Sequence, residues 1–188
     1  MQRKVILAST SPRRIELLKK IVPEFEVIGS DYEEDMTLPM PPAELVKYLS
    51  KGKAESVAKN YDDAIVIGGD TFIAFEDKVL GKPYTRERAK EMLTMLSGKT
   101  HSVFSGFTII DTKDGKIISR AVESKITFKE LPEKEIDDYV ATGEPLLRAA
   151  GYAIQTIGEK FTEKIEGDYD AIVGLPTKEV EEELKKFI

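Results

Sequence analysis

The sequence predicts a mixed α/β domain with long antiparallel strands. Apolar runs typical of strands alternate with segments of helical period along the whole chain. The turn signal Lys113-Asp-Gly-Lys116 joins two long strand-like stretches, 101–111 and 117–128, as in a β-hairpin. A hairpin inside an alternating pattern argues against a purely doubly wound parallel sheet, and so favours a mixed sheet.

The remaining elements follow from local signals. Further strands are predicted at 5–8, 25–28, 64–67, 72–75, 152–157 and 161–165, with a turn at 76–78. Helices are predicted at 12–20, 43–59, 85–97, 132–141 and from 176 onward. The apolar residues of each helix fall on one face, and Gly98 provides a stop signal for the third.

Length and composition set the broad class. A chain of 188 residues with 41% apolar residues is long enough for one domain, 1–188, with a sizeable core. The absence of cysteine removes disulfides and thiolate chemistry. No apolar run has the length of a membrane span or a signal peptide, so we expect a cytoplasmic protein without a membrane partner. A net charge of −6 argues against nucleic acid as a partner.

The charges are unevenly spread. Residues 1–20 carry six basic side chains and one acid, whereas residues 23–44 carry seven acids and no base. Such a pair of blocks suits a site that holds both an anion and a metal ion. The alternative is two solvated surfaces that neutralise each other.

The start of the first predicted helix suggests an anion site. Ser9-Thr10-Ser11-Pro12 follows the first strand, and Arg13 and Arg14 then occupy the first turn. Two arginines there oppose the positive end of the helix dipole unless an anion binds. Free backbone N–H groups, hydroxyls and guanidinium groups together suit a phosphate. The alternative is two arginines exposed to solvent.

Two further positions depart from their local pattern. Lys53 falls inside the apolar stripe of the predicted helix 43–59, so it either extends its amine to solvent or meets a buried anion. Gly68-Gly69-Asp70-Thr71 follows an apolar strand, and its glycines indicate either a bend or the close approach of another backbone. A bend would bring Asp70 and Thr71 to a sheet edge or cleft. Asp70 is then a candidate metal ligand or general base, or simply a turn-capping residue.

Gln155 is the polar residue within the predicted strand 152–157. Its amide offers a donor and an acceptor and can read a base edge, although it can equally lie on the solvent face of a strand. Walker and G-x-G-x-x-G patterns are absent, and one histidine without cysteine makes no zinc site. The remaining carboxylates, lysines, arginines and hydroxyls suit Mg²⁺ or Mn²⁺ and a phosphorylated substrate.

These motifs together resemble the Maf (septum formation inhibitor) family of nucleotide pyrophosphatases. The resemblance rests on segments spread over the whole chain: Leu7-Ala-Ser-Thr-Ser-Pro-Arg-Arg14, Glu33, Lys53-Ala54, Gly69-Asp-Thr71, Gly81-Lys-Pro83, His101-Ser-Val103, Tyr152-Ala-Ile-Gln155 and Gly174-Leu-Pro176. It implies a two-lobed fold around a long mixed sheet, similar to inosine triphosphate pyrophosphatases. The pair Ile154-Gln155 resembles the branch that acts on dTTP and UTP.

The resemblance also implies a reaction and the roles of residues. A nucleoside triphosphate would be hydrolysed to the monophosphate and pyrophosphate with a divalent metal, Mg²⁺ or Mn²⁺. By position, Asp70 would be the general base, Glu33 a catalytic or metal-binding carboxylate, and Lys53 and Lys82 phosphate-binding groups. The base would be selected by Arg13, Thr71 and Gln155.

The expected role is the removal of non-canonical or modified pyrimidine triphosphates, linked to septum formation, by a homodimer. Two other functions stay open at this point. One is a non-enzymatic, nucleotide-binding regulator of septation. The other is a pyrophosphatase specific for purines or 7-methyl-GTP on the same fold.

Overall fold

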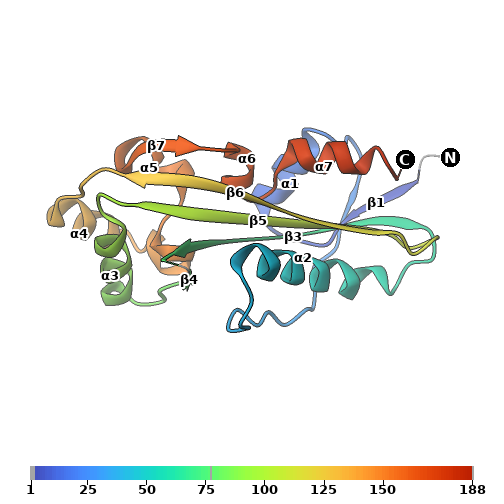
Figure 1. The fold of residues 1–188 in the computed structure, drawn as a ribbon, viewed down its shortest axis with the longest axis horizontal. Coiled ribbons are helices and arrows are strands. Elements are labelled where there is room, and N and C mark those ends of the chain that lie inside the picture. The colour runs from blue at the N-terminus through green and yellow to red at the C-terminus, as the bar shows by residue number, and fades with distance from the viewer. Residues whose placement is uncertain (1–2, 77, 188) are drawn as a thin grey trace. The chain divides into compact units, whose positions relative to one another are not determined.

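The computed structural model describes residues 3–76 and 78–187, and Figure 1 shows its helices and strands. In chain order the elements are β1 (Lys4–Leu7), α1 (Pro12–Lys19), β2 (Glu26–Val27), α2 (Pro42–Ala58), β3 (Ala64–Phe75), β4 (Lys78–Leu80), α3 (Arg86–Leu96), β5 (Thr100–Asp111), β6 (Ile117–Phe128), α4 (Glu133–Ala141), the 3₁₀ turns η1 (Glu144–Leu147) and η2 (Ala149–Gly151), α5 (Ile154–Phe161), β7 (Thr162–Glu166), α6 (Tyr169–Val173) and α7 (Thr177–Leu184). No helix of the described ranges combines the length and the apolar character that a bilayer span needs.

All strands belong to one seven-stranded mixed sheet in the order β2-β1-β3-β5-β6-β7, with β4 paired to β3. β1 pairs in parallel with both β2 and β3, whereas β4 and β7 pair antiparallel with β3 and β6. The long strands β5 and β6 are joined by the predicted turn, where the N–H of Asp111 donates to the carbonyl of Lys116. The predicted mixed α/β fold with a central hairpin is therefore confirmed.

The chain divides into two compact units. The first comprises Met1–Thr71, Phe104–Val122 and Asp170–Ile188, and the second comprises Phe72–Val103 and Glu123–Tyr169. The chain passes from one unit to the other within β3, β5 and β6, so each of these strands contributes to both.

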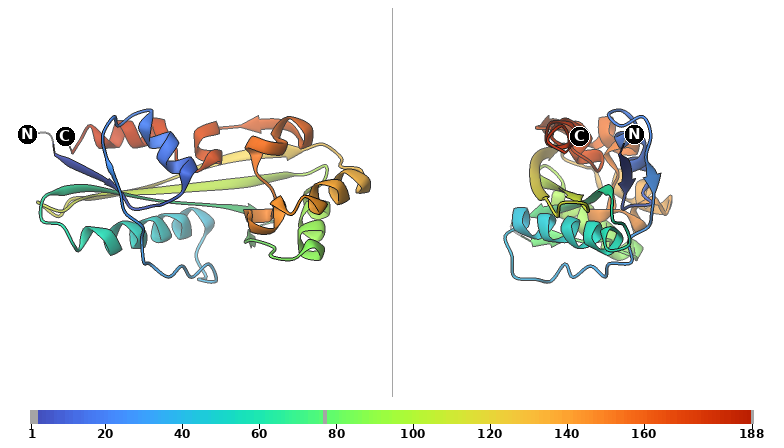
Figure 2. Two further views of the ribbon diagram at one scale, coloured as in Figure 1. Left: turned by 180° about the vertical axis from the view of Figure 1, so that it is seen from behind. Right: turned by 90° about the vertical axis from the view of Figure 1, so that its right-hand side faces the viewer.

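In the first unit, helices cover both faces of the strands (Figures 1 and 2). Successive residues of β3 point to opposite faces because a strand has a period of two. Val66 belongs to an apolar cluster with Ala54 and Val57 of α2. Position 69 instead faces α1, since a Cβ there would lie 3.2 Å from Nε of Arg14. The register of β3 thus decides which side chains meet α2 and which meet α1.

Helix α2 lies unusually close to the sheet because two glycines leave room for its backbone. A Cβ at Gly68 would lie 2.5 Å from the carbonyl oxygen of Ser50, and one at Gly106 would lie 2.5 Å from that of Val46. Of the two alternatives for Gly68-Gly69, the bend is wrong, since β3 continues without interruption from Ala64 to Phe75. The glycine at position 68 instead allows the close approach of the α2 backbone.

The strand predicted at 152–157 is also wrong. Tyr152 is extended, and helix α5 begins at Ile154. The buried side chains of Ile154, Ile157 and Phe161 are spaced three and four residues apart, which is a helical period. The sequence reading also missed α6, the two 3₁₀ turns and the return strand β4. The predicted turn 76–78 includes Asp77, which lies outside the described residues.

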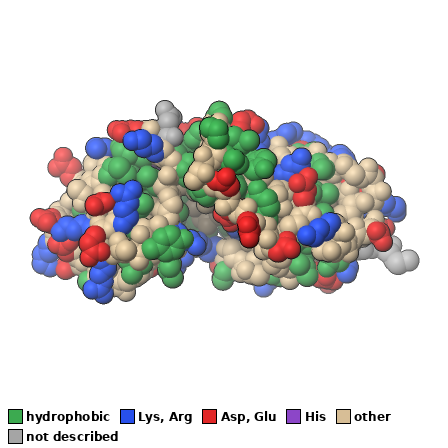
Figure 3. Space-filling view, turned by 90° about the horizontal axis from the view of Figure 1, so that it is seen from below, with side chains coloured by type: hydrophobic (Ala, Val, Ile, Leu, Met, Phe, Trp, Pro, Cys, Tyr) green, Lys and Arg blue, Asp and Glu red, His purple; other side chains and the backbone are tan. Residues whose placement is uncertain are grey.

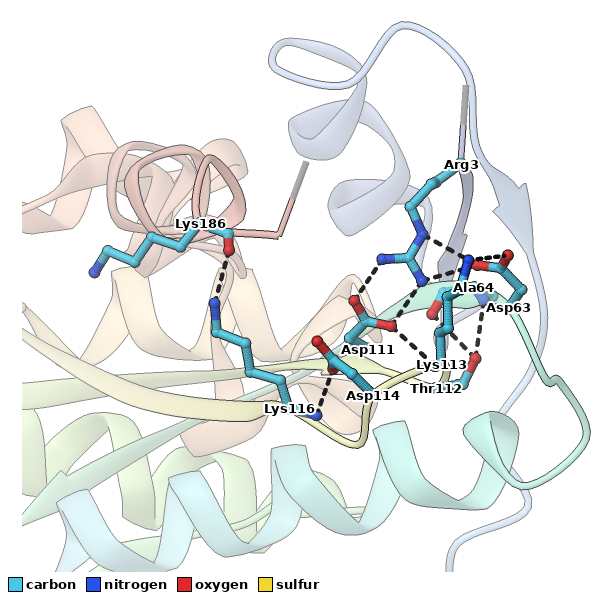
Figure 4. A network of polar contacts seen from close by, with 9 residues as sticks. All are labelled: Arg3, Asp63, Ala64, Asp111, Thr112, Lys113, Asp114, Lys116 and Lys186. Carbon is cyan, nitrogen blue, oxygen red and sulfur yellow. Dashed lines mark hydrogen bonds and ion pairs between the residues drawn. The ribbon is translucent and has the colours of Figure 1, made fainter. Parts of the chain in front are cut away.

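Ion pairs tie the ends of several strands together on the surface of the first unit. Arg3 donates to Asp63, just before β3, and to Asp111, at the end of β5 (Figure 4). The pKa of the Asp111 carboxyl is lowered to about 2, and the hydrogen bond from Arg3 is the largest cause. Lys4 of the basic block pairs with Glu26 of the acidic block. On the face shown in Figure 3, basic and acidic side chains are interspersed. Part of the charge asymmetry is therefore neutralised locally.

We expect Gly106→Ala to lower the free energy of unfolding by about 1–3 kcal/mol, because the new methyl group would force the backbone of α2 away from β5. Gly81→Ala is the matched control, since no heavy atom lies within 4 Å of a Cβ there, and its change should stay within about 0.5 kcal/mol. Urea denaturation of the three proteins measures both effects. Equal stability of the two variants would contradict the close packing of α2.

Candidate functional site

A buried ion pair lies between α2 and β3. Nζ of Lys53 lies 2.5 Å from Oδ1 of Asp70 and 2.7 Å from Oε1 of Glu34. Lys53 and Asp70 are 9% and 5% exposed, so both charges are almost removed from water. Of the two alternatives that the sequence left for Lys53, the buried anion is the correct one, and that anion is Asp70.

The second carboxylate oxygen of Asp70 is unusual. Oδ2 is buried and has no hydrogen-bond partner among the described residues. Buried polar atoms are nearly always hydrogen-bonded, because an unmade bond costs about 1–3 kcal/mol. Lys53 holds the carboxylate through Oδ1 and leaves Oδ2 available. This is the state in which a carboxylate can accept a proton or bind a cation.

Arg14 approaches the same segment of β3 from α1. Its Nε donates to the carbonyl of Gly174 at 3.0 Å, and its Nη1 lies 3.4 Å from Oγ of the buried Ser9. Burial lowers the pKa of Arg14, while attraction to Asp70 and Glu34 opposes this effect. The guanidinium nevertheless stays charged, as arginine does in proteins.

The start of α1 has the features that an anion site requires. The N-cap residue Ser11 makes no side-chain capping bond, and no acidic residue occupies the first turn. The backbone N–H groups of a helix start lack intrahelical acceptors. Together with Arg13, Arg14 and Ser9 they fit the predicted phosphate-binding segment. Arg13 lies in this first turn and is half-buried.

A carbonyl that the sequence reading did not single out joins two of the predicted residues. Gly174 O accepts from Nε of Arg14 and, at 3.2 Å, from the hydroxyl of Thr71. Ser105 Oγ lies 3.0 Å from the Thr71 hydroxyl, whose one hydrogen points to Gly174, so Ser105 donates here. Gly174 has φ = 147°, a conformation that L side chains rarely adopt.

The acidic loop contributes Glu34, the neighbour of the predicted Glu33. Glu33 and Glu34 are both exposed, and Glu34 pairs with Lys53. The loop is close to α2 at Gly52, where a Cβ would lie 2.4 Å from the ring of Tyr32. Glycine at position 52 therefore lets Tyr32 pack against the helix one residue before Lys53, and Glu34 follows two residues after Tyr32.

The second unit contains the other two predicted site residues, Lys82 and Gln155. Lys82 is exposed in the connection between β4 and α3. The preceding carbonyl, of Gly81, accepts from the N–H of Ala150 at 3.0 Å. Gln155 is exposed in the first turn of α5 and lines a surface pocket of about 680 Å³ with Thr156, Lys164 and Tyr169 among others.

Comparison with known proteins now identifies the family. A model described as "Maf-like protein" matches residues 4–187. The chain belongs to the Maf family. Maf relatives called dTTP/UTP pyrophosphatase occur in Bacillus cereus strain B4264 and Bacillus anthracis, and the chain is 46% and 48% identical to them over 185 residues. Each alignment covers 98% of this chain and 96% of the relative. The family resemblance of the motifs is confirmed.

Two solved structures share the fold of this Maf chain. The Staphylococcus aureus Ham1 protein superposes with a TM-score of 0.55 at 15% identity, over 99% of this chain and 100% of its own. A HAM1 protein from Coxiella burnetii gives 0.52 at 11% identity, over 98% and 100% of the two chains. At such identities the likeness shows the fold alone.

The first unit of the Maf chain thus brings Ser9, Arg14, Lys53, Asp70 and Thr71 together. Sequence reasoning missed Glu34, Ser105 and Gly174 as members of this cluster. Gly174 stood in the motif Gly174-Leu-Pro176, which gave a detectable signal. Glu34 gave none, because one acid among seven looks ordinary.

We expect Lys53→Met to lower the free energy of unfolding by about 3–5 kcal/mol, because it leaves the buried Asp70 carboxylate without its partner. The double variant Lys53→Met/Asp70→Asn should recover part of this loss, since no uncompensated buried charge remains. Urea denaturation at neutral pH of the wild type, the two single variants and the double variant measures these changes in the free energy of unfolding.

Lys47→Met on the same helix is the matched control for Lys53→Met. Lys47 is partly exposed and pairs with Glu44 one turn away, so its loss should change stability by no more than about 0.5 kcal/mol. A Lys53→Met variant as stable as the wild type would show that Asp70 does not depend on this lysine.

Proposed function

We propose that this protein hydrolyses the nucleoside triphosphates dTTP and UTP to the monophosphate and pyrophosphate. The observation that carries the proposal is the buried Asp70 carboxylate, held by Lys53 through one oxygen with the other oxygen unpaired. The relatives named dTTP/UTP pyrophosphatase support the substrates. Incubation of the pure protein with UTP and Mg²⁺ or Mn²⁺, followed by detection of UMP and pyrophosphate, tests it.

In the proposed reaction, Oδ2 of Asp70 accepts a proton from the water that attacks the α-phosphorus. A new P–O bond forms, and the bond between the α-phosphorus and the bridging oxygen breaks as pyrophosphate leaves. Lys53 fixes the orientation of the Asp70 carboxylate. Arg14, oriented by Gly174, stabilises negative charge on the phosphates, and we assign the same task to Arg13, Lys82 and the start of α1.

The residues present fit a divalent cation. Asp70 offers one free buried oxygen, and Glu33 and Glu34 lie on the adjoining loop. Among the described residues no group of three or more histidines or acids forms a ready metal site. Mg²⁺ usually takes one or two protein carboxylates and completes its shell with water and substrate phosphates. Such a cation would neutralise phosphate charge and acidify a bound water. We therefore keep Asp70 and Glu33 as proposed ligands and add Glu34.

We propose that Gln155 reads the base. A uracil or thymine ring presents an acceptor, O4, beside a donor, N3–H, and one amide can meet both. The exposed position of Gln155 at the start of α5 leaves its amide free for a ligand. Arg13 and Thr71 remain predicted determinants of base choice. The homodimer, the role in removing modified nucleotides and the link to septation also remain predictions.

Asp70→Asn should lower kcat for UTP by at least about 10²-fold, the usual scale for a general base, with little change in shape. Asp111→Asn is the matched control: it is also a buried aspartate paired with a basic residue, but it lies in the Arg3 cluster. It should reduce stability and leave kcat unchanged. Turnover of UTP near the wild-type rate by Asp70→Asn would refute the assignment.

Gln155→Glu should lower kcat/KM for UTP and dTTP by roughly 10²-fold, because an ionised carboxylate cannot donate to O4 and repels it. Hydrolysis of GTP should not fall by the same factor, since the donors N1–H and N2–H₂ of guanine can face a carboxylate. Parallel measurement of kcat/KM for the three nucleotides decides the matter. An equal loss for all three would mean that Gln155 does not read the base.

A further inference from the structure

The one histidine of the chain lies in the core of the second unit and has no part in the proposed reaction. His101, on β5, is 2% exposed. Its Nε2 is hydrogen-bonded to the hydroxyl of Tyr152 at 2.5 Å, whereas its Nδ1 has no partner among the described residues. The bond to Tyr152 is therefore the directional contact that fixes the imidazole ring.

Tyr152 lies directly before the segment that carries Gln155. On its N-terminal side, Ala150 and Gly151 have φ of 53° and 77°, and the N–H of Ala150 donates to Gly81, next to Lys82. On its C-terminal side, the N–H groups of Thr156 and Ile157 both donate to Ala153, so the first turn of α5 begins one residue after Tyr152. Tyr152 is thus held immediately before this turn.

Aromatic rings secure both ends of α5. The ring of Phe128 contacts His101 and Tyr152 edge-on at centroid distances of 4.9 Å, and it contacts Phe161 at 6.1 Å. Tyr152 precedes α5 and Phe161 ends it. Because both ends pack on Phe128, the rotation of α5 about its axis is constrained. This rotation places Gln155 on the exposed side of the helix.

We propose that His101 and Tyr152 are positioning residues that set the orientation of the Gln155 amide, an inference that rests on the proposed function. A bidentate contact with a base needs the amide aligned to within about 10–20°. Burial lowers the pKa of His101 to about 4 and raises that of Tyr152, so both groups are neutral at ordinary assay pH. A neutral hydrogen bond that joins two segments 51 residues apart in the chain suits a positioning role.

A double-mutant cycle on substrate preference tests this role. The variants are Tyr152→Phe, which removes only the hydroxyl, His101→Leu, and the combination of both. The quantity measured is the ratio of kcat/KM for UTP to kcat/KM for GTP. We expect each single variant to lower this ratio about three- to tenfold, mainly through KM for UTP, and the double variant to lower it no further.

Two further variants separate positioning from a general loss of stability. His101→Gln keeps a polar group near the place of Nε2 and should recover part of the ratio. Ser124→Ala removes another buried hydroxyl of the same unit, one that donates to the carbonyl of Asp168, and should lower the melting temperature without changing the ratio. If His101→Leu does not fold, Tyr152→Phe and His101→Gln still test the inference.

The possible failures are distinguishable. If the wild-type protein releases no UMP from UTP, the proposed function is wrong and the inference falls with it. If the wild type is active but the ratio is unchanged in folded Tyr152→Phe, the pair has only a structural role and the inference alone is overturned. The inference would also be overturned if the double variant lowered the ratio by the product of the two single effects, because the two residues would then act independently.

Discussion

The pairing of Lys53 with Asp70 is the interaction on which the rest of the first unit depends. Two charges that are almost fully buried are costly unless each meets the other in good geometry. The two glycines that let α2 approach β3 and β5 make this geometry available. Stability alone does not explain the pair, since apolar residues of similar volume often do as well. The pair also holds Oδ1 of Asp70 in place while Oδ2 has no partner among the described residues.

The two faces of β3 carry residues with different contacts in this cluster. Asp70 faces α2 and its lysine, whereas Gly69 and Thr71 face α1 and the Gly174 carbonyl. A slip of one residue in the register of β3 would exchange these faces, so the parallel pairing with β1 maintains the site as well as the sheet. On the α1 face, the one carbonyl of Gly174 accepts hydrogen bonds from both Arg14 and Thr71 and so orients both side chains.

Much of this arrangement could be predicted from the sequence wherever a residue opposes its local pattern. Lys53 in an apolar stripe required a buried partner, and Asp70 is that partner. The two arginines at a helix start predict a bound anion, and that anion stays a prediction. The failures have physical causes as well. The strand predicted at 152–157 overlooked the spacing of Ile154, Ile157 and Phe161. At Gly68-Gly69 the local pattern could not decide between a bend and a close backbone approach, because only the tertiary position of α2 decides it. Glu34 escaped notice because a tertiary contact with Lys53, not a local pattern, selects it.

The geometry of Asp70 also sharpens the competition between its two proposed roles. Oδ1 is committed to Lys53, so Oδ2 alone is left for either proton uptake or metal binding. One oxygen that donates its lone pair to a cation is a poor base. If Asp70 is the base, other carboxylates of the protein must bind the cation. The acidic loop can provide them, because its exposed carboxylates lie on the segment that contacts Lys53 through Glu34. The acidic loop, for which the sequence left a solvated surface as one alternative, then binds the cation. Metal binding by the loop leaves Asp70 to accept the proton.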